Sequence, residues 1–233
     1  MKRAFDVSVA VTLVIVLFPL MAMIALAVWA DGSGPILYRG IRVGRRGAPF
    51  QMLKFRTMVP ASKTSREITV HGDPRITRIG LVLRATKLDE LPQLVNVLRG
   101  DMSLVGPRPE SPRYVAHYTE EQRAVLTVRP GITGPSQVLF RHEEHLLRVP
   151  VPELYYLTVI MPAKLAIDME YVRSRSLWGD IKIIIMTARS IVWPLDPPVL
   201  PTPVDLAQGA SAEKASKEVA HGVPTYTALT TRK

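Results

Sequence analysis

The chain has 233 residues, which is enough for one domain with a hydrophobic core and a short appendage. Its net charge of +10 predicts an anionic partner, such as a nucleic acid, a phosphorylated metabolite or an anionic lipid surface. The absence of cysteine excludes a disulfide framework, a thiolate metal site and a cysteine nucleophile.

The first predicted element is an apolar segment at residues 7–28. Its length of about 22 residues is sufficient for a helix that crosses the hydrocarbon core of a bilayer. Three interpretations compete: a re-entrant helix that returns to the face it entered, a single spanning helix, and a cleaved signal peptide. The apolar run is too long for a typical signal peptide, and Asp6 intrudes at its start.

The charges around this segment favour the re-entrant helix. Lys2 and Arg3 precede it, and four arginines follow it at 39–46. The positive-inside tendency would hold both ends in the cytosol, which a spanning helix does not satisfy. Pro19 lies near the middle, where it removes a backbone donor and kinks a helix. We therefore rank the re-entrant helix first, with its break at Pro19, the spanning helix second and the signal peptide third.

The remaining pattern predicts a mixed α/β fold that is mainly helical. Short β-like runs at 36–38 and 50–55 come first, and 60–75 is a polar loop. Helices are expected at 79–84, 88–98, 119–128, 153–176 and 180–193. The last of these is amphipathic and ends in tryptophan, which suits a membrane interface or, equally, a protein core.

These elements divide the chain into three parts. Residues 1–34 are expected to form the membrane helix and its exit turn, and residues 35–193 a small cytosolic domain with interfacial amphipathic helices. Residues 194–233 are rich in Pro, Ala, Ser and Lys, a composition that predicts a disordered tail.

An adjacent pair of carboxylates, Asp89 and Glu90, is the most informative feature of this basic chain. Pro92 is tolerated in the first turn of a helix, so the helix is expected to begin at about Leu88 or Asp89. Both carboxylates would then lie at the positive end of the helix dipole. The pair suits a nucleophile or a metal ligand for a phosphorylated substrate. From the local pattern alone, however, an N-cap role for Asp89 is the better interpretation.

Several long motifs resemble those of the bacterial sugar transferases, the monotopic polyprenyl-phosphate phosphoglycosyl transferases that start exopolysaccharide, capsule, O-antigen or glycan assembly. The resemblance covers roughly residues 1 to 193 and excludes the tail. After Lys2, Arg3 and Asp6 at the start of the apolar helix, the motifs are KFRTM at 54–58, DPRITRIG at 73–80, LDELPQL at 88–94, GDMSLVGPRP at 100–109 and PGITG at 130–134. Without a further group of apolar helices, the chain resembles the short, catalytic-core form of the family.

The resemblance implies a reaction and a location. The reaction is transfer of a sugar-1-phosphate from a UDP-sugar to polyprenyl (undecaprenyl) phosphate, with release of UMP, through a covalent aspartyl-phosphosugar. The location is the cytoplasmic face of the bacterial inner membrane, which the chain would enter as a monotopic protein through its re-entrant helix. Mg²⁺ is the implied cofactor, and membrane lipids are the implied surroundings.

The resemblance also implies roles for individual residues. Asp89 is the expected nucleophile and Glu90 its dyad partner, and both are expected metal ligands, since an oxygen-only site suits Mg²⁺. Whether Glu90 binds the metal or accepts a proton stays open. The other implied positions are Arg84 and Arg108 for substrate phosphate, Lys54 and Arg56 of the basic strand, and Asp168 as a further acidic site residue.

A second hypothesis belongs to a different class. In it the chain is a non-catalytic, membrane-anchored basic protein that binds nucleic acid or anionic lipid through residues 39–87. An adjacent Asp-Glu pair adds nothing to such a protein, and aromatic residues for base stacking are scarce at 6% of the chain. The enzyme without a nucleic-acid partner is therefore the favoured prediction, with its sugar and oligomeric state left open.

Overall fold

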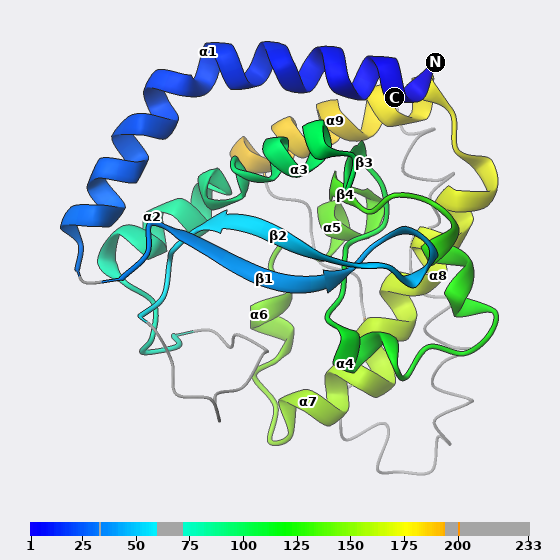
Figure 1. Ribbon diagram of the computed structural model, residues 1–233. Helices are drawn as coiled ribbons and strands as arrows, with labels where there is room; N and C mark the ends of the chain where they lie inside the picture. Colours follow the sequence, from blue (N-terminus) through cyan, green and yellow to red (C-terminus); the bar gives the residue numbers. More distant parts are fainter. Residues whose placement is uncertain (33, 60–71, 194–199, 201–233) are drawn as a thin grey trace.

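The computed structural model of the chain describes residues 1–32, 34–59, 72–193 and 200 (Figure 1). Within them the fold is mixed α/β and mainly helical, as predicted. The tail expected to be disordered and most of the polar loop expected at 60–75 lie outside the described residues, so those two predictions stay untested.

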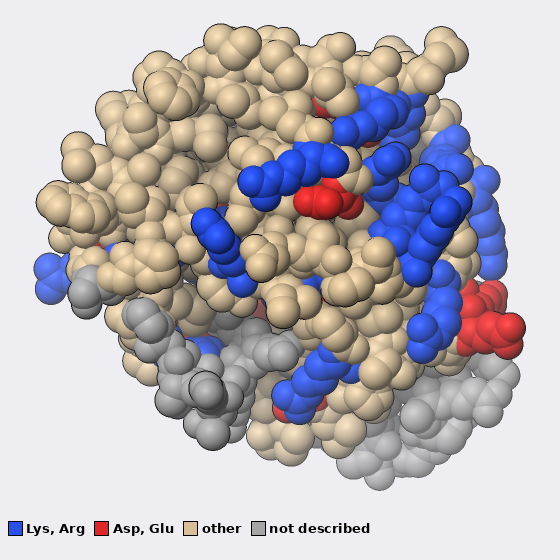
Figure 2. Space-filling model, viewed as in Figure 1, with Lys and Arg blue, Asp and Glu red and all other residues tan. Residues whose placement is uncertain are grey.

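Helix α1, Lys2–Ala30, is the predicted apolar helix. Within the described residues it is the one helix long and apolar enough, by length and composition, to cross a membrane. Figure 1 shows α1 bent around the rest of the molecule, and Pro19 inside the helix is the usual cause of such a bend. The surface along the top and upper left of Figure 2, where α1 runs, is almost uncharged, whereas Lys and Arg side chains gather in the centre and on the right of that view.

Both ends of α1 are fastened to the domain by basic side chains. At the start, Arg3 donates hydrogen bonds to the carbonyl oxygens of Val97 and Leu98, at 2.7 and 3.2 Å. At the end, Arg56 Nη2 donates to the carbonyl oxygens of Val28 and Gly32, at 2.7 and 2.9 Å. The two ends of the apolar helix are therefore held by one and the same folded body.

Strands β1, Leu37–Val43, and β2, Pro49–Phe55, form an antiparallel hairpin closed by the 3₁₀ turn η1, Arg45–Gly47. The first strand is longer than the predicted run at 36–38, because its pairing with β2 continues through Gly40, which lies opposite Met52. The buried side chain of Asn96 supports β2 from the side. Its Oδ1 accepts a hydrogen bond from the Leu53 N–H at 3.0 Å, and its Nδ2 donates to the Gln51 carbonyl at 2.8 Å.

The segment that carries the carboxylate pair differs from its prediction. Helix α2, Arg78–Thr86, is capped by Thr77 and followed by the 3₁₀ turn η2, Leu88–Glu90. Helix α3, Gln93–Arg99, begins only after Pro92, so the expected start at Leu88 or Asp89 is wrong. The physical reason is local: Lys87 adopts a left-handed conformation (φ 60°), and Pro92 has no N–H to continue a helix through it.

A second, parallel pair of short strands follows, β3, Ser103–Val105, and β4, Gly131–Thr133, neither of which was predicted. Gly106 and Gly131 lie so close that a Cβ on Gly131 would be 2.1 Å from the Gly106 nitrogen. Between these strands lie α4, Pro112–Val115, and the 3₁₀ helix η3, Gln122–Thr127, where an α-helix was expected.

The remaining helices build the core beneath the hairpin. The predicted 153–176 helix is realised as α7, Pro152–Tyr155, a π-helical turn, Tyr156–Ile160, and α8, Met161–Ser174. Short helices α5, Pro135–Leu139, and α6, Glu143–Leu146, precede it. Helix α9, Leu177–Val192, is the predicted last helix; it is capped by Ser176 and packs Ile183 into a cluster with Leu94 and Met102.

Candidate active site

The carboxylate pair lies in the tight η2 turn between α2 and α3. Both side chains are buried, Asp89 at 5% and Glu90 at 8% relative exposure. Hydrogen bonds from the Glu90 N–H to the Lys87 carbonyl, and from the Leu91 N–H to the Leu88 carbonyl, hold the turn. Because this turn is separate from α3, the charges of neighbouring side chains, more than a helix dipole, govern the ionisation of the pair.

Lys54 on β2 and Arg108 on the Pro-Arg-Pro turn reach the pair from two other parts of the fold. Lys54 Nζ donates to Glu90 Oε1 at 2.7 Å and lies 3.9 Å from Asp89 Oδ2. Arg108 Nη1 lies 3.7 Å from the same Glu90 oxygen and donates to Gln137 Oε1 at 3.1 Å. The fold therefore brings Lys54, 36 positions before Glu90, and Arg108, 18 positions after it, to one carboxylate.

The cations act on the two carboxyl groups unequally. Burial would raise the pKa of Glu90, but Lys54, Arg108 and Lys87 together outweigh it and lower that pKa to about 2. Burial raises the pKa of Asp89, and the negative charge of Glu90 adds to the rise, against the opposing effect of Lys54. Glu90 is thus firmly ionised, while Asp89 is the more readily protonated member of the pair.

One carboxylate oxygen of the pair is uncommitted. Asp89 Oδ1 is buried and has no hydrogen-bond partner among the described residues. A buried carboxylate oxygen without a donor is costly unless a ligand or a cation meets it. Asp89 and Glu90 together fit Mg²⁺, which takes oxygen ligands and usually binds through one or two carboxylates plus substrate phosphates.

A second buried polar cluster lies behind Arg108. Lys164 on α8 contacts Glu143 Oε2 at 2.8 Å and Glu110 Oε1 at 3.6 Å. The Tyr156 hydroxyl donates to Glu110 Oε1 at 2.6 Å. Burial lowers the pKa of Arg108, but the charges of Glu90, Glu143 and Glu110 outweigh it and raise that pKa. This cluster therefore adds to the effect of Glu90 in keeping Arg108 charged.

Asp168, the predicted acidic residue, lies on α8 at 3% exposure. Its Oδ2 accepts a hydrogen bond from the Ser136 hydroxyl at 2.8 Å, and its Oδ1 has no partner among the described residues. Burial raises the pKa of Asp168 to about 7, against the opposing effects of Ser136 and Lys164. We find it beneath the Pro-Arg-Pro turn, where the Arg108 backbone N–H also favours its ionised form.

The other two predicted arginines, Arg84 and Arg56, lie in different parts of the structure. Arg84, in the last turn of α2, is close enough for its charge to lower the pKa of Asp89. Arg56 is buried against the end of α1, where its contacts with Val28 and Gly32 are structural. Its expected phosphate contact stays a prediction, and the structure gives it no contact with the dyad.

Sequence reasoning missed Lys87, Gln137 and the cluster around Lys164. Lys87 directly precedes η2, and its charge acts on both carboxylates of the pair. The basic run ending at Lys87 is visible in the sequence, but the left-handed conformation that turns its backbone at this point is not. Gln137 and Lys164 carry no local signal, because a glutamine or lysine within a helical pattern is ordinarily a surface residue.

A comparison with protein families decides the assignment. Residues 1–194 match the family described as bacterial sugar transferase. The chain belongs to the bacterial sugar transferase family.

Relatives of this bacterial sugar transferase carry informative names. The UDP-glucose:undecaprenyl-phosphate glucose-1-phosphate transferase of Caulobacter vibrioides is 41% identical over 82% of this chain and 69% of its own length. The undecaprenyl-phosphate glucose phosphotransferase of Komagataeibacter xylinus is 40% identical over 81% of this chain and 35% of its own length. The undecaprenyl-phosphate galactose phosphotransferase of Salmonella typhimurium is 36% identical over 82% of this chain and 40% of its own length. The chain thus spans well under half the length of the last two.

Proposed function

We propose that this bacterial sugar transferase moves a hexose-1-phosphate from a UDP-sugar to undecaprenyl phosphate and releases UMP. The observation that carries the proposal is the buried Asp89–Glu90 pair, on which cations from two other segments converge. The names of the relatives supply the reaction class and its two substrates. A basic binding protein has no use for a buried carboxylate with one oxygen uncommitted, so the enzyme is the better explanation of the site.

In the first step, a carboxylate oxygen of Asp89 attacks the β-phosphorus of the UDP-sugar. A bond forms between this oxygen and phosphorus, the bond from phosphorus to the bridging oxygen breaks, and UMP leaves with that electron pair. In the second step, a phosphate oxygen of undecaprenyl phosphate attacks the same phosphorus and displaces the Asp89 carboxylate. The buried position of Asp89 keeps water from taking the place of the lipid acceptor.

The cations of the site have two tasks in this scheme. Arg84 and Arg108 offer guanidinium groups to the diphosphate, since a carboxylate approaches a dianion only where the like charges are neutralised. Lys54 forms a close ion pair with Glu90, and the positive charge of Lys54 also acts on Asp89. Mg²⁺, for which Asp89 and Glu90 are the proposed ligands, supplies further charge neutralisation at the phosphates when bound.

The role of Glu90 is narrowed by its surroundings. With a pKa of about 2, Glu90 is a weak proton acceptor at neutral pH. We therefore assign it to holding cations, both Lys54 and the metal ion, and not to general-base catalysis.

We further propose that α1 is re-entrant and holds the domain at the cytoplasmic face of the inner membrane. Support comes from its two attachments, Arg3 at the start and Arg56 at the end. A spanning helix would leave its two ends on opposite sides of a bilayer about 30 Å thick, and a single folded body cannot bind both. Cysteine tags at residue 1 and residue 34 are both expected to react only from the cytoplasmic side; a periplasmic N-terminus would overturn this topology.

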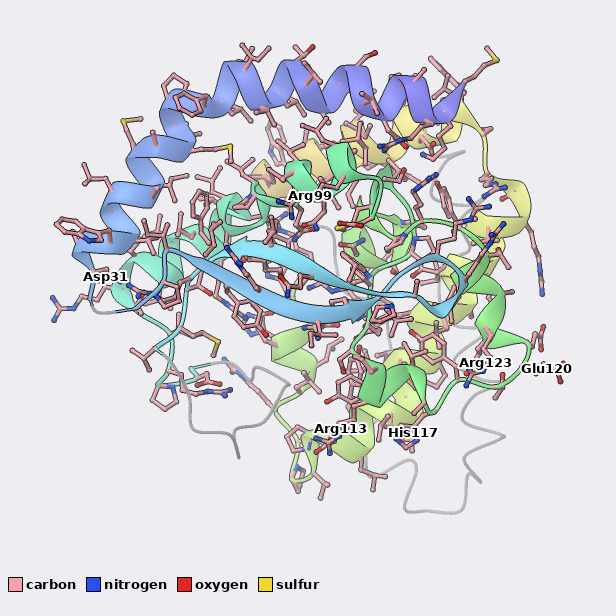
Figure 3. All side chains as sticks on the ribbon, viewed as in Figure 1. Asp31, Arg99, Arg113, His117, Glu120 and Arg123 are labelled. Carbon is pink, nitrogen blue, oxygen red and sulfur yellow. The ribbon has the colours of Figure 1, made fainter. Side chains whose placement is uncertain are left out.

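The reaction is tested with the full chain in membranes, with undecaprenyl phosphate, Mg²⁺ and a panel of UDP-hexoses. Asp89→Asn is expected to reduce UMP release at least about 10³-fold, whereas Asp31→Asn, at the end of α1 (Figure 3), serves as the matched control. When the lipid acceptor is withheld, a phosphosugar is expected on the peptide that contains Asp89. Near-normal turnover of Asp89→Asn would overturn the nucleophile, and an active enzyme without the adduct would point to direct transfer.

A further inference from the structure

A group of nitrogen and oxygen ligands outside the proposed chemistry lies at α6. His142, Glu144 and His145 occupy one turn of the chain. Their ligand atoms, one from each side chain, all lie within 4.8 Å of one another. The two imidazole rings face each other edge to face, with centroids 6.0 Å apart. Three side chains of metal-binding type thus converge on one point, from a stretch of four residues.

We propose that His142, Glu144 and His145 form a binding site for a divalent transition-metal ion of the Zn²⁺ class, separate from the Mg²⁺ site of the dyad. Two imidazoles and one carboxylate are a known ligand set for zinc, with a remaining position open to water or another ligand. Imidazole nitrogen favours zinc, cobalt or nickel over Mg²⁺, which prefers oxygen. The two sites therefore differ in the ion that each selects.

Two neighbouring side chains hold the turn in place. Glu143, between His142 and Glu144, contacts Lys164 at 2.8 Å. Arg141, directly before the turn, donates from Nη2 to the Ala85 carbonyl at 3.0 Å. Its Nη1 reaches the Ser190 hydroxyl at 3.5 Å. With these two attachments the turn loses less conformational freedom when a metal binds, which favours affinity.

The surrounding charges set limits on this site. Arg141, directly before the turn, and Lys87, next to the dyad, place positive charge near His142, and Glu144 places negative charge there. The same cations repel a metal ion, and Glu144 offsets only part of that charge. We accordingly expect a site of moderate affinity that selects by ligand type.

The position connects the site with the proposed active site. The charge of Lys87, next to the dyad, reaches His142, and Glu143 within the turn acts on Arg108. An ion at α6 would thus add positive charge and rigidity to the segment whose Glu143 acts on Arg108. This consequence rests on the proposed function, whereas metal binding itself does not.

The test is Co²⁺ binding to the purified full chain in detergent, after treatment with a chelator and in the presence of excess Mg²⁺. We expect one equivalent of Co²⁺ to give visible d–d absorption bands that Zn²⁺ abolishes by displacement. His145→Ala and Glu144→Gln are each expected to weaken Co²⁺ binding at least about tenfold, which corresponds to about 1.4 kcal/mol. Asp89→Asn is expected to bind Co²⁺ normally, so failure of the proposed reaction and failure of this site are distinguishable.

The matched control is His117→Ala. His117 lies on the loop after α4, at the edge of the domain and clear of α6 (Figures 1 and 3). Two further histidines, at 71 and 221, lie outside the described residues. Wild-type bands that persist in the His142→Ala/His145→Ala variant, or that vanish only when residue 71 or 221 is replaced, would overturn the proposal. Unchanged thermal unfolding of Glu144→Gln without metal would show that its loss of binding is not a loss of fold.

Discussion

Lys54 Nζ lies 2.7 Å from Glu90 Oε1 and 3.9 Å from Asp89 Oδ2, so one ammonium group on β2 serves both carboxylates of the η2 turn. This relationship divides the dyad into a strongly ionised member and a member that is easier to protonate. It also ties the hairpin to the turn. Removing this one side chain therefore tests both the electrostatics of the site and its assembly.

Lys54→Met is expected to lower UMP release at least about 100-fold, a loss typical of removing one preorganised charge from an active site. Because Glu90 loses its closest partner, we also expect a loss of about 1 to 2 kcal/mol in the free energy of unfolding, reduced by the partial exposure of Lys54. Turnover and urea unfolding measure the two effects. Arg39→Met removes a positive charge from the exposed face of β1 and is the control; an equal loss in both variants would contradict a specific role for Lys54.

The rate of the proposed reaction should fall at acidic pH, because only ionised Asp89 attacks phosphorus. The pKa of Asp89 is raised, so this fall should lie above the ordinary range of an aspartate. Glu90→Gln removes a negative neighbour and should move the fall to lower pH, whereas Lys54→Met removes a positive neighbour and should move it to higher pH. Relative rates from pH 4 to 9 measure both shifts. Identical pH profiles in both variants and the wild type would assign the titration to another group.

Asp168 should make the protein less stable as pH rises. Its pKa is raised from 3.8 to about 7 in the folded chain, so it stays protonated there after the unfolded chain has ionised. The stability is complete below about pH 4 and lost progressively up to about pH 7, a difference of at most about 4 kcal/mol. Asp168→Asn should remove this dependence, so its stability relative to the wild type should increase from pH 5 to pH 8 by up to about 4 kcal/mol. The two chains are compared by urea unfolding at pH 5 and pH 8, and a difference that does not grow with pH would refute the assignment.

Gly131→Ala tests the close approach that positions the Pro-Arg-Pro turn. The added Cβ would meet the Gly106 nitrogen at 2.1 Å and the Thr133 oxygen at 2.3 Å, and both are backbone atoms that move only with their strands. We expect a loss of about 3 kcal/mol in the free energy of unfolding and lower turnover, since Arg108 follows two residues after Gly106. Gly47→Ala, with φ of +77° and open space around it, should cost only about 1 kcal/mol. Equal losses would mean that backbone conformation, and not the steric contact, decides.

Much of the fold could be predicted from patterns of short range. The apolar helix, the last amphipathic helix and part of each hairpin strand follow from composition and periodicity, which local residues determine, whereas the pairing of the two strands was not predicted. Elements whose form depends on distant partners could not be predicted. The 3₁₀ turn at Asp89 follows from the left-handed Lys87, and β3 exists because β4, 28 positions later in register, pairs with it.

The candidate site shows the same division. Asp89, Glu90, Lys54 and Arg108 belong to recognisable motifs, and the fold brings them together. Arg56 belongs to an equally recognisable motif, yet its guanidinium turns to the end of α1, because buried carbonyls there require donors. A motif thus identifies which residues matter without telling which of them face the substrate and which face the scaffold.

The two-point attachment of α1 has a mechanical consequence. A domain joined to the bilayer by one flexible linker would sample many heights and tilts above the lipid headgroups. A domain attached to both ends of a bent membrane helix would sample few heights and tilts. In the proposed re-entrant topology, the length of α1 would then determine the height at which the domain lies above the membrane. One residue added between Arg3 and Pro19 would lengthen that arm by about 1.5 Å and rotate it by roughly 100°, which would change how Asp89 faces a lipid-borne phosphate.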